Sequence, residues 1–483
     1  MAWLPIGLAV ALSSLLLGIT STRYGYHRDE LYFRMLEPAW GYVDQPPLTP
    51  LLARTAIALF GDTVWAIRLP AMLCVAGAVL LTALTTRELG GGRAAQGLAA
   101  TGFAFSPLVL VAGHVMSTAS LDIAVWAAVI LFSVRALLRD EPRWWLAAGA
   151  VVGLGLYNKL LIVLLLVSMA GGLLAVGPRA VLRSRWLWAG VALALVLAAP
   201  NLVYQATHDW PQITMAGALA EDDGDENRVL LIPFQLLLLG IGLAWFCYVG
   251  FRQLLRRPEW RDVRALAIAY PIAVGITLVT GGAVYYPLSL LSFLFAAGCV
   301  STGQALARPG VRSGVALAVG LNTALSVIIA LPVLPVDVLG RTPIPEINQV
   351  ARDSVGWSEY VKTVADVYRG LSIEDQSRAV LYTGNYGEAG ALDRYGPDYV
   401  LPAVYSGQNE LWFAGPPPDS ATVVVAWTQN LAGLSRLFAS CERKAEIDNG
   451  VGVDNEEQGS VVAVCREPRG GWSAVWPQLQ HYD

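Results

Sequence analysis

The sequence predicts an α-helical, multi-pass membrane protein with a soluble α/β domain at its C-terminal end. Hydrophobic residues make up 55% of the 483 residues and charged residues only 14%, whereas soluble domains carry about 25% charged residues. Long apolar segments recur up to residue 335, and the stretch after it holds 31 of the 70 Lys, Arg, Asp and Glu residues. We therefore expect a membrane domain at 1–335 and an extracytoplasmic α/β domain at 336–483.

The membrane domain is expected to contain about eleven transmembrane helices, because a helix needs roughly 20 apolar residues to cross the hydrocarbon core. Neither an internal repeat nor an interrupted helix is evident. Residues 1–22 lack the basic start of a signal peptide, so we expect a first helix there. The expected segments are 3–22, 65–86, 94–113, 115–135, 144–158, 160–178, 186–206, 229–251, 265–280, 284–304 and 314–335.

The arginines indicate the orientation, because short cytoplasmic loops are enriched in Lys and Arg. With a cytoplasmic N-terminus, five consecutive inside connections carry fifteen arginines, and an odd number of spans places the C-terminal domain outside. The inside set is Arg87, Arg93, Arg135, Arg139, Arg143, Arg179, Arg183, Arg185, Arg252, Arg256, Arg257, Arg261, Arg264, Arg308 and Arg312.

The C-terminal domain shows short apolar runs that alternate with amphipathic segments, a pattern typical of an α/β domain. Helices are expected at 355–370, 387–395 and 431–438, and strands at 379–383, 421–427 and 461–465. Cys441 and Cys465 would form a disulfide in an oxidising compartment. The Gly-bearing turn at 383–388 is either a simple connection or an anion-binding turn.

Composition and missing motifs exclude several classes of function. A formal net charge of -4 argues against nucleic-acid binding. The sequence contains no P-loop, nucleophile-elbow or zinc-protease motif and no paired Cys spacing. No cofactor is therefore expected, and the sequence leaves open only a divalent metal.

Two acidic positions are candidates for chemistry. Asp29 and Glu30 follow the outer end of the first helix, where a carboxylate can act as a base. The alternatives are a solvated helix cap or a loop charge paired with Arg28 or Arg34. Asp122 is the sole acidic residue inside a predicted span, and such a residue is a functional candidate because its burial in lipid is unfavourable. The alternative for Asp122 is a hydrogen bond to Ser117, Thr118 or Ser120.

Further polar residues are predicted on the same outer side. Lys159 is the only lysine among the first 361 residues, and it either holds a phosphate or extends its ammonium to the membrane interface. His27, His208, Tyr285 and Tyr286 are expected on this side as well.

These residues resemble a known family. The elements His27-Arg28-Asp29-Glu30-Leu-Tyr-Phe and Tyr42-x-Asp44-Gln45-Pro-Pro-Leu, together with Asp122 in the fourth helix, are similar to the GT-C fold glycosyltransferases over residues 1–305. More narrowly, they resemble glycosyltransferase family 39, which includes bacterial relatives of the protein O-mannosyltransferases and of the aminoarabinose transferase of lipid A. That family transfers a sugar from a polyprenyl-phosphate carrier to an extracytoplasmic acceptor, usually with inversion.

The resemblance implies roles for individual residues. Asp29 matches the family's catalytic acidic residue, which would act as the base, and Asp122 matches the second acidic residue of the cavity. Asp44 and Gln45 fall where aminoarabinose transferases have an acidic and a basic residue, so Gln45 lacks that cation. The implied substrate-binding residues are His27, Arg28, Glu30, Tyr42, Asp44, Gln45, Lys159, His208, Tyr285 and Tyr286.

The expected partners are a polyprenyl-phosphate-linked sugar, membrane lipids and an extracytoplasmic glycan, lipid or protein acceptor. Two other classes of function stay open. The first is a transporter or lipid flippase, although no repeat supports it. The second is a non-catalytic envelope assembly protein, in which Asp29 and Asp122 would tolerate replacement.

Overall fold

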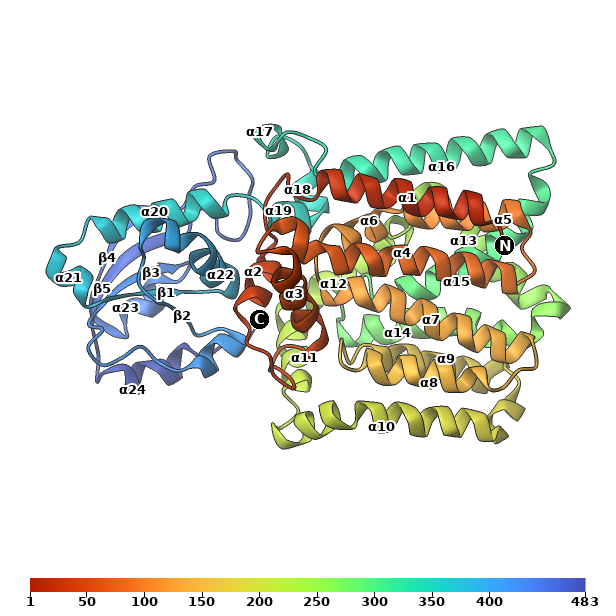
Figure 1. Ribbon diagram of the computed structural model, residues 1–483, viewed down its shortest axis with the longest axis horizontal. Coiled ribbons are helices and arrows are strands. Elements are labelled where there is room, and N and C mark those ends of the chain that lie inside the picture. Colours follow the sequence, from red (N-terminus) through yellow and green to blue (C-terminus); the bar gives the residue numbers. More distant parts are fainter. Residues whose placement is uncertain (483) are drawn as a thin grey trace. The chain divides into compact units, whose positions relative to one another are not determined.

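The computed structural model describes residues 1–482, which form two compact units (Figure 1). The helical unit comprises Met1–Thr20, Gln45–Thr49 and Arg68–Leu331, and the α/β unit comprises Ser21–Asp44, Pro50–Ile67 and residues 332–482. A single cut at residue 335 does not reproduce this division, because most of the loop that follows the first helix packs with the C-terminal part of the chain.

The helical unit is built from helices of 8 to 25 residues, with two short 3-10 turns between them. Its helices are α1 (Trp3–Thr20), α4 (Val64–Glu88), α5 (Arg93–Ala104), α6 (Pro107–His114), α7 (Thr118–Leu138), α8 (Trp144–Gly155), α9 (Ile162–Val176), α10 (Arg185–Thr207), α11 (Pro211–Asp222), α12 (Gly224–Leu237), α13 (Ile241–Arg256), α14 (Arg264–Thr280), α15 (Leu288–Ala305) and α16 (Pro309–Ala330).

Within residues 1–482, seven helices are long and apolar enough to cross a membrane, or nine if each bent pair counts as one span. All eleven predicted segments are helical, but two of them are shorter than a span: α8 has 12 residues and α9 has 15. The expectation of uninterrupted helices is wrong, because α5 and α6 meet at 58° and α12 and α13 meet at 89°.

The sharper break, between α12 and α13, depends on Gly240. Its φ is 92°, a conformation that glycine adopts most readily, and a Cβ there would lie 2.0 Å from Asn322 Oδ1. The Asn322 side chain donates from Nδ2 to the Leu239 carbonyl at 2.9 Å. This bond satisfies a carbonyl that the interruption removes from the helical pattern.

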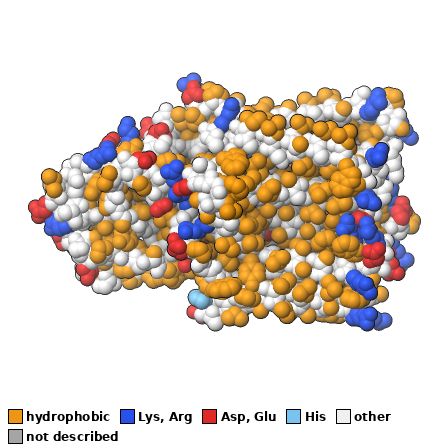
Figure 2. All heavy atoms as spheres, viewed as in Figure 1, with side chains coloured by type: hydrophobic (Ala, Val, Ile, Leu, Met, Phe, Trp, Pro, Cys, Tyr) orange, Lys and Arg blue, Asp and Glu red, His pale blue; other side chains and the backbone are white. Residues whose placement is uncertain are grey.

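The surface of the helical unit is that of a membrane protein. Figure 2 shows hydrophobic side chains over the long helices and Lys and Arg side chains gathered at the end where the N-terminus lies. Large apolar side chains are exposed along these helices, among them Leu4, Leu73, Trp188, Val196, Trp245, Val279 and Leu317. Since water would not favour such a surface, the chain is a multi-pass membrane protein.

The α/β unit contains a five-stranded mixed sheet in the order β2-β1-β3-β5-β4. β1 pairs in parallel with β2 and β3, and β5 pairs antiparallel with β3 and β4. The strands are β1 (Ala379–Thr383), β2 (Val404–Ser406), β3 (Val423–Thr428), β4 (Phe438–Glu446) and β5 (Val461–Pro468). The helices are α2 (Arg28–Met35), α3 (Leu48–Phe60, which begins in the helical unit), α17 (Val336–Leu339), α18 (Ile344–Ile347), α19 (Gln349–Arg352), α20 (Trp357–Arg369), α21 (Ile373–Ser377), α22 (Tyr386–Tyr395), α23 (Leu431–Ser435) and α24 (Trp472–Val475).

Both faces of this sheet are covered, because alternate residues of β3 contact different clusters. Val423 packs with Val464 and with Tyr368 near the end of α20, whereas Val424 packs with Trp472. The predicted disulfide joins Cys441 and Cys465, which face each other on β4 and β5.

Two details of the predicted α/β domain differ from the structure. The predicted helix at 431–438 ends at Ser435, and Phe438 instead begins β4. Strands β2 and β4 were not predicted.

Candidate functional site

The predicted site residues fall into two groups, one in each unit. In the helical unit, Asp122 lies near the start of α7 and is 7% exposed. Its Oδ1 accepts a hydrogen bond from Asn158 Nδ2 at 2.8 Å. Its Oδ2 is buried and has no hydrogen-bond partner within the described part of the chain. One carboxylate oxygen is therefore held in place and the other stays open.

The partner of Asp122 differs from the three that the sequence suggested. Ser117 and Ser120 hydrogen-bond to each other at 3.1 Å as the cap of α7. Asn158, which is fully buried, also donates to the Thr118 carbonyl at 2.9 Å. The sequence offered one signal for Asn158, namely its position directly before Lys159.

Lys159 lies against two of the predicted tyrosines. Its ammonium is 5.8 Å from the ring centre of Tyr285 and 5.0 Å from that of Tyr286, within the range of cation–π attraction. Asp122 and both tyrosines line a cavity of about 30 Å³, which has room for roughly one water molecule. The structure thus brings four predicted site residues together in the helical unit.

In the α/β unit, Asp29 lies in the first turn of α2, and two predicted site residues shape the start of this helix. The His27 ring nitrogen Nδ1 accepts from the Asp29 backbone N–H at 3.3 Å, and the Glu30 carboxylate accepts from the His27 N–H at 2.9 Å. This reciprocal pattern is a capping box. His27 and Glu30 therefore fix the local backbone that carries Asp29.

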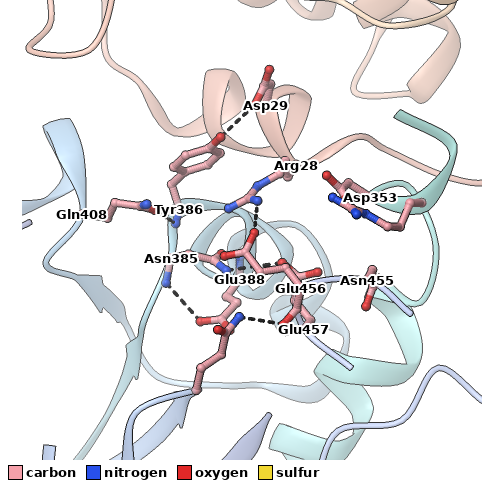
Figure 3. A network of polar contacts seen from close by, with 12 residues as sticks. Arg28, Asp29, Asp353, Asn385, Tyr386, Glu388, Gln408, Asn455, Glu456 and Glu457 are labelled. Carbon is pink, nitrogen blue, oxygen red and sulfur yellow. Dashed lines mark hydrogen bonds and ion pairs between the residues drawn. The ribbon is translucent and has the colours of Figure 1, made fainter. Parts of the chain in front are cut away.

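The Asp29 carboxylate is both oriented and accessible. Its Oδ1 accepts a hydrogen bond from the Tyr386 hydroxyl at 3.0 Å, its Oδ2 is 3.8 Å from His27 Nδ1, and the side chain is 33% exposed. Tyr386 was not predicted as a site residue, although the Gly-bearing turn that contains it was singled out. Figure 3 shows the Tyr386 side chain reaching from the start of α22 toward Asp29.

Asp44 and Tyr42 follow on the next part of the loop. Tyr32 donates from its hydroxyl to Asp44 Oδ1 at 3.1 Å. Burial, supplemented by the negative charges of Glu410 and Asp29, raises the pKa of Asp44 to about 7. Tyr42 is buried and donates to the Glu37 carbonyl at 2.7 Å.

The other predicted residues are Arg28, which lies beside Asp29 on α2, and Gln45 and His208. Arg28 forms an ion pair with Glu456. Gln45 belongs to the helical unit and is buried. His208 is exposed at the end of α10, where its ring stacks on Tyr204 with 4.1 Å between centroids. Among residues 1–482, no three His, Cys, Asp or Glu side chains form a group that could hold a metal ion.

Comparison with known proteins gives a family match and a fold. Residues 44–204, about a third of the chain, match the model of the dolichyl-phosphate-mannose-protein mannosyltransferase family. Among curated proteins, none matches the sequence. The structure is similar to that of ArnT from Cupriavidus metallidurans bound to undecaprenyl phosphate, with a TM-score of 0.61, 16% identity, and coverage of 96% of this chain and 98% of that one. The apo state of the same protein matches with a TM-score of 0.58, again at 16% identity, over 95% of this chain and 97% of that one. This chain therefore has the GT-C fold of ArnT.

Proposed function

We propose that the protein is an integral-membrane glycosyltransferase that moves a sugar from a polyprenyl-phosphate donor to an acceptor outside the membrane, with inversion at the anomeric carbon. The fold supports this proposal, because the similar ArnT structure is described as bound to undecaprenyl phosphate. The acceptor is a hydroxyl of a glycan, lipid or protein.

The observation that best supports the proposal is the exposure and orientation of the Asp29 carboxylate. A general base must be reachable by the acceptor and held in one orientation. The Asp29 side chain meets both conditions, because it is one-third exposed and Tyr386 fixes one of its oxygens. In the proposed reaction the acceptor oxygen attacks the anomeric carbon, the bond from that carbon to the phosphate oxygen breaks, and the acceptor proton moves to Asp29.

Lys159 is the residue that we assign to the departing phosphate. The charge that develops on a leaving phosphate is stabilised by a preorganised cation. Arg28 forms an ion pair with Glu456, whereas Lys159 lies over the rings of Tyr285 and Tyr286 and near the carboxylate of Asp122. Asp122, next to this group, orients the acceptor or a neighbouring side chain through its open oxygen.

We further propose that the protein lies in the cell membrane with its C-terminal domain outside the cytoplasm. The arginines that gather at one end of the helical unit support this placement, because that end would face the cytoplasm. A reporter that is active only in the cytoplasm, fused to the C-terminus, should stay inactive. An active fusion would overturn the orientation and the side on which the reaction is placed.

The test of the function is sugar transfer by detergent-purified protein from a defined polyprenyl-phosphate sugar to acceptors extracted from the cell envelope. Asp29→Asn keeps the shape of the side chain and removes the proton acceptor, so transfer should fall about 10²- to 10⁴-fold. The matched control is Asp398→Asn, the same change at an exposed aspartate of the α/β unit. Size-exclusion and thermal unfolding profiles check the fold of both variants.

The outcomes separate the competing functions. Normal transfer by Asp29→Asn would remove this residue as the base. Movement of a lipid-linked sugar across vesicles without a new glycosidic product would instead identify a transporter, a class that also uses interrupted helices. Neither transfer nor transport would favour the non-catalytic assembly protein.

A further inference from the structure

Helix α22 of the C-terminal domain lies in close backbone contact with α2, the helix that carries Asp29. A Cβ added to Gly390 would lie 2.6 Å from the backbone carbon of Leu31, and one added to Gly387 would lie 2.9 Å from Arg28 Cβ. Two glycines on successive turns of α22 thus allow the approach, and any larger residue would force the helices apart. The start of α22 is therefore held at a fixed distance from Asp29.

Tyr386, the first residue of α22, is oriented from several directions. Its ring packs on Tyr32 with 4.8 Å between centroids, and the Arg28 guanidinium lies 4.9 Å from its ring centre. Its backbone N–H donates to Gln408 Oε1 at 2.6 Å. With the ring and backbone held in this way, the Tyr386 hydroxyl donates a hydrogen bond to Asp29 Oδ1 at 3.0 Å.

A network of carboxylates and amides holds the surrounding segments (Figure 3). Arg28 pairs with Glu456, and Asn385 donates from Nδ2 to Glu457 at 3.3 Å. Glu388 accepts from the backbone N–H groups of Gly384 and Asn385 at 2.8 and 3.1 Å. The network ties α2 to segments more than 350 residues away in sequence, so the C-terminal domain determines where Asp29 is placed.

We propose that Tyr386 is a positioning residue for the catalytic base: its hydroxyl holds the Asp29 carboxylate in the reactive orientation. This proposal rests on the proposed function and gives the C-terminal domain a part in the active site. A hydroxyl that donates to a charged carboxylate favours the charged form, which is the form that accepts a proton. With Oδ1 bound to Tyr386, Oδ2 is the oxygen that takes the acceptor proton.

The test is Tyr386→Phe in the full chain. The ring contacts with Tyr32 and Arg28 stay, and only the hydrogen bond is lost. We expect kcat to fall about 10-fold, since a hydrogen bond to a charged group is worth roughly that factor or more, while the KM for the donor stays unchanged. The acid limb of the pH–rate profile should move to higher pH. His27 and Asp44 are other titratable groups near Asp29, and Glu410 lies near Asp44; the substitution changes none of them.

The matched control is Tyr395→Phe, which removes the same hydroxyl nine residues further along α22, about 13 Å away. It should leave both kcat and the pH profile as in the wild type. A second variant carries a fluorotyrosine at position 386, which keeps the ring and the hydrogen bond but makes the hydroxyl more acidic. It should move the acid limb to lower pH, and it serves as the test if Tyr386→Phe fails to fold.

The outcomes distinguish this inference from the proposed function. Wild-type kcat and pH profile in Tyr386→Phe, with Asp29→Asn inactive, would overturn the inference and leave the function standing. A lower kcat without any shift of the acid limb would show a purely structural role and would also overturn it. Normal transfer by Asp29→Asn would remove the base itself, and the inference with it.

Discussion

The helical unit and the α/β unit each contain a buried polar cluster, and the balance of charge differs between them. The helical cluster contains one carboxylate, Asp122, and one nearby ammonium, Lys159, and Asp122 Oδ2 has no hydrogen-bond partner in the described chain. The α/β cluster contains more acids than bases, since Glu456 and Glu457 lie near Arg28 and Glu388 lies near both of these glutamates.

This difference separates a ligand site from a structural one. A carboxylate with an open oxygen near an ammonium can bind a charged substrate. An excess of buried acids favours protonation instead: burial, reinforced by Glu457, raises the pKa of Glu388, and burial raises that of Glu457 to about 7 although Arg28 opposes the shift. Neutral acids hold segments together by hydrogen bonds, so under the proposed function the α/β cluster would orient Asp29 and the helical cluster would meet the donor.

The largest expected effect is the loss of sugar transfer when Lys159 is replaced. If its ammonium stabilises the departing phosphate, Lys159→Met should lower transfer about 100-fold, because the loss of one preorganised donor typically has an effect of this size. The measurement is transfer together with donor binding by the purified variant. Lys362→Met, at an exposed lysine of α20, should leave both unchanged. Transfer within twofold of wild type in Lys159→Met would contradict the proposed difference between the two clusters, because the helical cluster would then have no role in the chemistry.

The second effect is a packing change at Gly390. Gly390→Ala places a methyl group against the Leu31 backbone, and such overpacking typically destabilises by about 1–3 kcal/mol. The thermal unfolding temperature and kcat should both fall. In Gly396→Ala the new methyl would meet only Leu401 side-chain atoms at 3.5 Å or more, so little change is expected. If the two variants unfold alike, α2 and α22 do not approach each other closely.

The smallest expected effect is a change in how thermal stability depends on pH when Glu457 is replaced. Since its pKa is raised to about 7 in the folded state from an ordinary 4.5, its contribution to stability is complete below about pH 4.5 and is lost as pH rises through 7. Glu457→Gln keeps the volume and removes this titration, so its unfolding temperature should fall less between pH 5 and pH 8 than that of the wild type.

The measurement for Glu457 is a series of thermal unfolding curves across this pH range, where a difference on the order of a few degrees is expected. Glu346→Gln, at an exposed glutamate of the same unit, should follow the wild-type curve. Parallel curves for all three proteins would mean that the α/β cluster is not protonated and would remove the contrast between the two clusters.

Sequence patterns predicted the central strands better than the edges of the sheet. β1, β3 and β5 were expected because they are apolar, and β1 and β3 are buried along their whole length. β2 has three residues, and β4 is exposed at most positions. Edge strands are often short or charged, so their strand character comes from pairing with a neighbour rather than from their own composition.

In the candidate site, too, some residues could be predicted from local sequence and others could not. Asp29 and Asp122 stood out because one lies in a recognisable motif and the other is an acid within an apolar helix, and both signals are local. Their partners Tyr386 and Asn158 are 357 and 36 residues away in sequence. Nothing in the residues near Asp29 indicates which distant hydroxyl will meet it.

The sequence by itself determined the membrane character, the α/β class of the C-terminal domain, the disulfide and the acidic positions, because each depends on local composition or spacing. Only the tertiary structure decided that the helices are broken at two places, that Asn158 meets Asp122, and that the C-terminal domain supplies Tyr386 to Asp29. These features depend on contacts between segments far apart in the chain, and such contacts form when buried polar groups must find partners on folding.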